Sequence, residues 1–157
     1  MAALAPIGGR GAFISGGLLG GPFASPWRID RGPLLDLGPH VIDLLDAALG
    51  PVSAIRAHGD LHRWVGLQLE HESGAVSDAS LCATARVATS VAGVEVFGPR
   101  GSASVDCLAA ASAGSFANLR REFAEAVASG AGHALDVHRG LYLQRLITHA
   151  EGQLLKA

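Results

Sequence analysis

The chain has 157 residues, of which 49% are hydrophobic and 17% charged, and its formal net charge is −2. This length predicts one domain with a sizeable core. The balanced charge excludes the basic surface needed to bind nucleic acid or an anionic membrane. No apolar run reaches the ~18 residues of a membrane span, and no secretory signal is recognisable. The two cysteines, Cys82 and Cys107, are too few for a disulfide framework, so we expect buried thiols in a reducing cytoplasm.

Residues 1–25 form a glycine-rich N-terminal segment. We expect a strand around residues 12–19 followed by a loop. A dinucleotide-binding turn is not indicated, because the third glycine and the preceding strand are missing. A P-loop is not indicated either, because Pro22 and Phe23 occupy the positions of the required Lys and Ser/Thr.

The next stretch predicts a helix over residues 33–49. Pro33 suits a first helical residue, and Gly50 followed by Pro51 is a strong stop. Pro39 conflicts with this helix, because it removes a backbone hydrogen bond. The helix could instead begin at Pro39, with Asp36 just before it.

Asp36, His40 and Asp43 have the spacing i, i+4, i+7, which places them on one face of such a helix. Histidine can take up a proton near neutral pH, and a neighbouring carboxylate can orient it. The face therefore suits proton transfer. The alternative is a polar stripe that only faces water.

From residue 52 the pattern becomes strand-like. We expect strands over residues 52–58, 64–70, 75–84, 89–98 and 102–108, with short loops that favour antiparallel pairing. Two helices follow, one over residues 115–129 with Phe116, Leu119, Phe123 and Val127 at core spacing, and one after Asp136. The expected class is α+β, an open, mainly antiparallel sheet of about five strands with helices packed on one face, in a domain over residues 26–157.

Several stretches carry a resemblance to one enzyme family. Residues 35–43 resemble the D-x-G-x-H-x-x-D signature of the Gfo/Idh/MocA oxidoreductases. Trp27 and Arg28 resemble the W-R that often precedes it. Further matches, in the family's order, are residues 94–101 (E-[IV]-[YF]-G-x-x-G), 123–126 (F-x-x-A) and 136–141 (D-[AG]-x-x-G-[LY], departing at Val137). They correspond to the family's C-terminal half.

The resemblance implies a substrate site for a sugar, cyclitol or similar hydroxyl compound. His40 resembles the general base and Asp36 its partner. Asp43 would be structural or substrate-adjacent, and Trp27 and Arg28 would edge the site. In the family, subunits associate through the sheet face that no helix covers, so we expect a homo-oligomer. The strands that contain Trp64, Leu67 and Leu69 would have their second face covered in this way. The alternative is a face that is merely small and polar.

The chain departs from the family in one large respect. It offers no Rossmann domain before Trp27, and the family's E-K-P lysine has no counterpart. We therefore expect no cofactor and no metal on this chain alone, with NAD or NADP supplied only through a partner Rossmann-domain polypeptide. The alternatives are a non-catalytic small-molecule-binding or dimerisation module, or a truncated gene product without an independent role.

Overall fold

The computed structural model describes residues 4–111 and 113–156. Residues 1–3 of the predicted N-terminal segment, and residues 112 and 157 of the predicted domain, lie outside the described residues. In chain order the elements are β1 (Gly8–Ile14), α1 (Pro26–Leu49), β2 (Val52–Gly59), β3 (Val65–His71), β4 (Val76–Cys82), β5 (Val91–Gly98), β6 (Gly101–Asp106), α2 (Cys107–Ala110), α3 (Ala113–Ser129) and α4 (Val137–Leu154).

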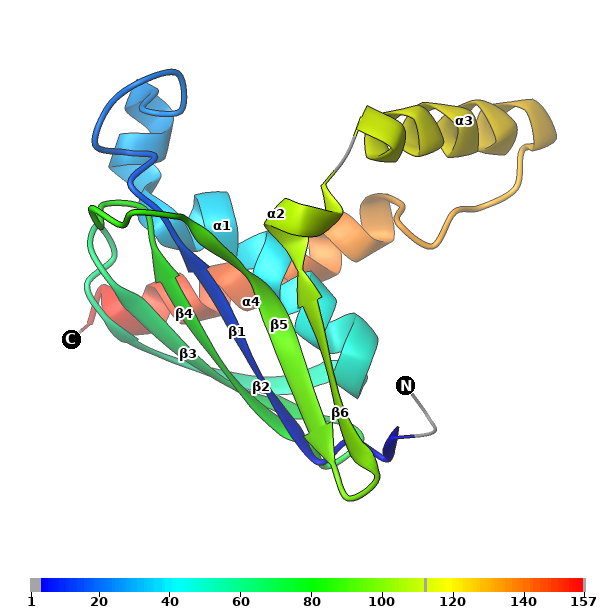
Figure 1. Ribbon diagram of the computed structural model, residues 1–157, viewed down its shortest axis with the longest axis horizontal. Helices are drawn as coiled ribbons and strands as arrows, with labels where there is room; N and C mark the ends of the chain where they lie inside the picture. Colours follow the sequence, from blue (N-terminus) through cyan, green and yellow to red (C-terminus); the bar gives the residue numbers. More distant parts are fainter. Residues whose placement is uncertain (1–3, 112, 157) are drawn as a thin grey trace.

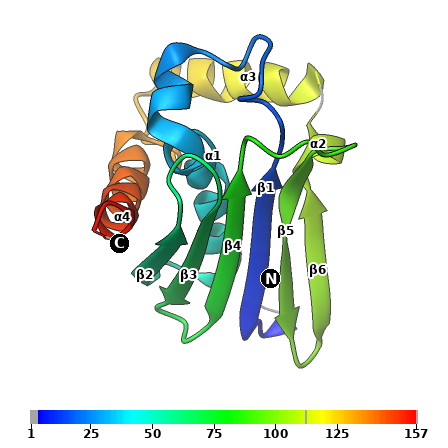
Figure 2. The same ribbon diagram turned by 90° about the vertical axis from the view of Figure 1, so that its left-hand side faces the viewer.

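The strands form one open sheet in the order β2-β3-β4-β1-β5-β6. Helices α1 and α4 cover one of its faces (Figures 1 and 2). Every neighbouring pair is antiparallel except β1 and β4, which are parallel. The expected α+β class is confirmed, with six strands in place of about five.

The sixth strand is β1, which comes from the glycine-rich segment and lies at the centre of the sheet. It starts earlier than the expected residues 12–19. Two of its glycines lie directly beneath α1: a Cβ on Gly11 would lie 2.5 Å from Cγ1 of Val41, and one on Gly9 would lie 3.1 Å from Cδ1 of Leu49. The glycines thus allow a helix to pack closely on the middle of the sheet.

Helix α1 begins at Pro26 and is kinked at Gly32, where φ is 69°. Only glycine fits this position, because a Cβ would lie 2.0 Å from the carbonyl oxygen of Leu61. From Pro33 the helix is continuous through Pro39 to Leu49, so the alternative start at Pro39 is wrong. Gly50 ends the helix with φ 97°, as expected.

The segment after β5 differs from expectation in two places. β6 ends at Asp106 instead of continuing to residue 108, because the Asp106 carboxylate caps α2 by accepting bonds from the amides of Leu108 and Ala109. Helix α3 forms as expected but projects away from the sheet (Figure 1), and its apolar residues are exposed instead of joining the core. Asp136 caps α4, as predicted.

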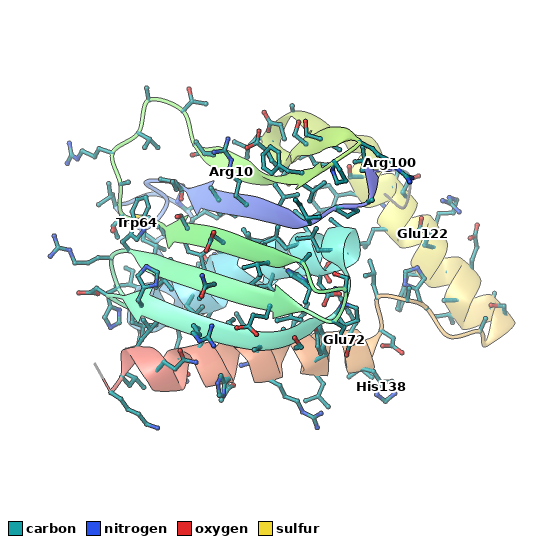
Figure 3. The ribbon with its side chains drawn as sticks, turned by 90° about the horizontal axis from the view of Figure 1, so that it is seen from below. Arg10, Trp64, Glu72, Arg100, Glu122 and His138 are labelled. Carbon is teal, nitrogen blue, oxygen red and sulfur yellow. The ribbon has the colours of Figure 1, made fainter. Side chains whose placement is uncertain are left out.

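Figure 3 looks onto the face of the sheet that no helix covers. Leu67 and Leu69 do not lie on this face; both are buried on the helix side. The uncovered face carries charged pairs, Arg10 with Glu95 and Arg56 with Glu70. By register it also carries three exposed apolar side chains, Val76, Val91 and Phe97.

The core lies between the sheet and the two helices, and α4 contributes Ile147 and Ala150 to it. Cys82 is buried and Cys107 half-buried, and both are free thiols. Within residues 4–111 and 113–156, no helix combines the length and apolarity that crossing a membrane demands.

Candidate active site

The face of α1 that carries Asp36, His40 and Asp43 points away from the core. The buried residues Leu34, Val41 and Leu45 lie on the opposite side of the helix. Asp36 and Asp43 are half-buried and His40 is exposed. The predicted shared face is therefore present in the fold.

Asp36 pairs with Arg28 across the kink at Gly32. The guanidinium Nε donates to Oδ1 of Asp36 at 2.9 Å, and the two side chains are only 29% and 17% exposed. The Arg28 guanidinium also lies over the ring of Trp27, 4.9 Å from its centroid, and 5.8 Å from that of Phe23. Trp27, Arg28 and Asp36, predicted as site residues, thus form one cluster.

His40 lies in a second place on the same helix. It lines a hollow of about 380 Å³ together with Asp43 from the next turn, and its ring lies 6.3 Å from that of Phe13. Cys107 and Leu108 from α2 close another side of the hollow. Burial, followed by the neighbouring Asp106 carboxylate, raises the pKa of the Cys107 thiol, so this wall of the hollow is a neutral thiol.

The expected contact between Asp36 and His40 is not formed in the structure. No hydrogen bond or ion pair joins these two described residues, and Asp36 does not line the hollow that contains His40. Asp43 is the carboxylate that shares the hollow with the imidazole. The site residues therefore divide into an Arg28–Asp36 cluster and a His40–Asp43 hollow.

Asp43 is itself held by a residue that the sequence did not single out. Arg139 of α4 donates to Oδ1 of Asp43 at 2.6 Å and contacts Oδ1 of Asp46 at 2.6 Å. Asp46 is 6% exposed, and its Oδ2 accepts from the Tyr142 hydroxyl at 2.5 Å and from the Val52 amide at 3.1 Å. These contacts lock α1 to α4 beside the hollow.

The ionisation of this network follows from its contacts. Burial acts to lower the pKa of Arg139, but the hydrogen bonds to Asp46 and Asp43 outweigh it and hold that pKa above the ordinary value. Burial, and then the bond to the Asp46 carboxylate, raises the pKa of Tyr142 to about 12. The arginine stays charged and the phenol stays neutral at physiological pH.

His71 is buried and has a structural role. His71 lies at the end of β3, with Nδ1 2.7 Å from the carbonyl oxygen of Gly50 and Nε2 2.8 Å from Oγ of Ser77. Over the described ranges, no three His, Cys, Asp or Glu side chains gather in a way that could hold a metal ion.

Comparison with known protein families shows to which family the chain belongs. Residues 17–104, more than half of the chain, match the model of the GFO/IDH/MocA C-terminal domain. The chain belongs to this family. No curated protein sequence matches it significantly.

Several solved structures share the fold of this chain. An oxidoreductase from Agrobacterium radiobacter in complex with NAD+, L-tartaric acid and magnesium is 19% identical, with a TM-score of 0.67 over 96% of this chain and 55% of that one. GenD2 from gentamicin A biosynthesis, in complex with NAD, is 18% identical, with a TM-score of 0.80 over 98% and 55%. UDP-N-acetylglucosamine 3-dehydrogenase GnnA from Acidithiobacillus ferrooxidans is 16% identical, with a TM-score of 0.77 over 95% and 53%. The chain thus spans about half the length of these structures.

The glycines of β1 that lie under α1 do not form a phosphate cradle. A phosphate cradle needs glycine backbone open to the ligand. Here the space above Gly9 and Gly11 is filled by Leu49, Val41 and Leu45 of α1. Gly9 and Gly11 therefore serve helix packing.

Proposed function

We propose that this chain is the substrate-binding half of an NAD(P)-dependent oxidoreductase that acts on a sugar, a cyclitol or a similar hydroxyl compound. The observation that carries the proposal is the position of His40. Unlike Asp36 and Asp43, it forms no hydrogen bond or ion pair within the described residues. Its imidazole is exposed at a hollow of about 380 Å³, large enough for a monosaccharide-sized ligand.

The proposed role of His40 is to take the proton from a substrate hydroxyl as the carbon that bears it is oxidised. Asp43 and the side chains around the hollow would receive other hydroxyl groups. Asp36, with one carboxylate oxygen held by Arg28 at 2.9 Å, would offer its second oxygen to the substrate, and Trp27 would form the edge of the site. Oxidation of an alcohol also needs a hydride acceptor, which we propose to be NAD or NADP held by a partner Rossmann-domain polypeptide.

The test is turnover of a panel of sugars and cyclitols by the chain mixed with its dinucleotide-binding partner and NAD or NADP, followed by the absorbance of the reduced nicotinamide. His40→Ala is expected to lower kcat by about 100-fold or more, the usual contribution of a positioned general base. The matched control is His138→Ala, an exposed histidine at the start of α4 outside the site (Figure 3). Equal turnover by His40→Ala and the wild type would remove His40 from the mechanism.

We also propose a second role, homo-oligomerisation through the uncovered sheet face. It is supported by Val76, Val91 and Phe97, which are each between 42% and 49% exposed there. Sedimentation at micromolar concentration tests it, with Phe97→Glu as the disrupting variant. A wild-type chain that sediments as a monomer would rule this role out.

A further inference from the structure

The hollow beside His40 is lined mainly by hydrocarbon. Its lining residues come from α1, from the end of β1, from the start of β5 and from α2. Those with apolar side chains are Phe13, Val41, Leu44, Ala92 and Leu108. Leu108 is 45% exposed, so a ligand in the hollow can contact it. The ionisable groups of the lining are the side chains of His40, Asp43 and Cys107.

The hydrogen-bonding capacity of the hollow is small. Oδ1 of Asp43 is occupied by Arg139 at 2.6 Å, which leaves Oδ2 for a ligand. His40 offers its ring nitrogens, because no hydrogen bond holds them within the described residues. Burial raises the pKa of the Cys107 thiol, which therefore stays neutral and is only a weak donor. His40 and Asp43 are neighbours on one face of α1, so together they can bind one hydroxyl group or two adjacent ones.

The hollow also lacks a cation for an acidic ligand. Among the described residues, no arginine or lysine lines it. The guanidinium of Arg139 contacts Asp46 as well as Asp43, so two carboxylates already balance its charge. The Asp106 carboxylate, which also acts to raise the pKa of Cys107, adds negative charge close to the hollow. A carboxylate or phosphate group on a ligand would therefore find no charged partner here.

Helix α2 supplies one apolar wall of the hollow. The Asp106 carboxylate fixes the start of this short helix by accepting bonds from the amides of Leu108 and Ala109 at 2.9 and 3.1 Å. This cap holds Cys107 and Leu108 at the hollow. A hydroxyl group placed against Leu108 would lose its water without gaining a partner, whereas a methyl group would gain from burial.

We propose that the hollow selects an uncharged hydroxyl compound with an apolar side, such as a sugar in which a methyl group replaces a hydroxymethyl group. The reacting hydroxyl group would lie at His40, an adjacent hydroxyl group at Asp43, and the apolar group at Leu108. Leu108 is then the residue that determines this specificity. The inference rests on the proposed function, because it places the substrate beside His40.

The test measures binding of sugars to the full chain, without nicotinamide, by nuclear magnetic resonance titration. The ligands are matched sets that differ only at carbon 6, which carries a hydroxymethyl group in the hexose, a methyl group in the 6-deoxyhexose and a carboxylate in the hexuronate. Each set is measured in the gluco, galacto and manno configurations. The variant is Leu108→Arg. The matched control, Leu155→Arg, adds the same charge at an exposed leucine at the end of α4. Circular dichroism verifies that both variants are folded.

In the configuration that binds best, we expect the wild type to bind the 6-deoxyhexose at least about fivefold more tightly than the hexose, and the hexuronate most weakly. Leu108→Arg should lose the preference for the methyl group and bind the hexuronate more tightly, and Leu155→Arg should behave as the wild type. Equal affinity of the wild type for the 6-deoxyhexose and the hexose would overturn the proposal. The absence of binding by every sugar, or an unchanged preference in Leu108→Arg, would do the same.

Binding and turnover are separate measurements, so this proposal and the proposed function fail separately. A preference that depends on Leu108, together with equal turnover by His40→Ala and the wild type, would keep the specificity and refute the catalytic role of His40. Turnover that depends on His40 but is the same for hexose and 6-deoxyhexose would keep the enzymatic role and refute the specificity.

Discussion

Replacing Arg139 by methionine tests the network that fixes α1 against α4. The substitution keeps the aliphatic stem and removes the guanidinium from both Asp43 and Asp46. Removing one partner of a buried ion pair costs about 3–5 kcal/mol, because a charge is left without compensation. The Asp43 side chain is 33% exposed, so water can replace the arginine there, whereas the Asp46 side chain is 5% exposed.

Asp46 therefore sets the magnitude. Its Oδ2 keeps the bonds from Tyr142 and Val52, and only Oδ1 loses its partner. This favours the lower end of the range, about 3 kcal/mol. With an m value of about 2 kcal/mol/M, the midpoint of urea unfolding should fall by about 1.5 M.

The assay is urea unfolding followed by circular dichroism for Arg139→Met, Asp46→Asn and the double variant. The two changes should be non-additive, with the double variant at least about 1 kcal/mol more stable than the sum predicts. Arg121→Met is the control, because its pair with Glu125 is exposed and worth about 0.5 kcal/mol or less. A loss below about 1 kcal/mol for Arg139→Met, or strict additivity, would refute the reasoning.

Two further outcomes follow from the packing of α1 and from Tyr142. Gly11→Ala should lower the free energy of unfolding in urea by about 1–3 kcal/mol, because its Cβ would lie 2.5 Å from Val41. Gly132→Ala has open space around it and should change that free energy by no more than about 0.5 kcal/mol. Equal effects of the two substitutions would contradict the close packing of α1 on Gly11. Tyr142, the sole tyrosine of the sequence, should ionise near pH 12 by tyrosinate absorbance, against about 10 in urea. Its raised pKa contributes stability that is present below about pH 10 and is lost as the pH rises through 12. After allowance for solvent the loss is roughly 1 kcal/mol, and Tyr142→Phe should not show it; ionisation near pH 10 in the folded chain would contradict this.

The helices and strands could be predicted because their signals are local. Pro33 and Gly50 bracket the main part of α1, and Asp136 caps α4 through its own neighbours. Glu72, Ser73 and Gly74 similarly mark the turn between β3 and β4. Such signals require no knowledge of distant residues.

The place of β1 could not be predicted because it depends on pairing at long range. Gly11 is paired with Ala79 on one side and Val94 on the other, and no local pattern specifies either partner. The same holds for Arg139, which reaches Asp43 across 96 positions of the sequence. The pattern of α3 likewise predicts an apolar side without saying what covers it.

The different roles of the residues along α1 follow from the contacts that hold this helix in place. Glycines of β1 fix its buried side, Gly38 brings it close to α4, where an added Cβ would lie 2.9 Å from Ile147, and Arg139 binds Asp43 and Asp46. Asp36 is held by Arg28. Among the ionisable groups of the signature, His40 alone has no hydrogen bond or ion pair within the described residues, and only a ring contact with Phe13 restrains it. An exposed imidazole on a helix held at Asp36, Asp43 and Asp46 has a fixed place and a free ring nitrogen, which suits the proposed proton transfer from a docked substrate.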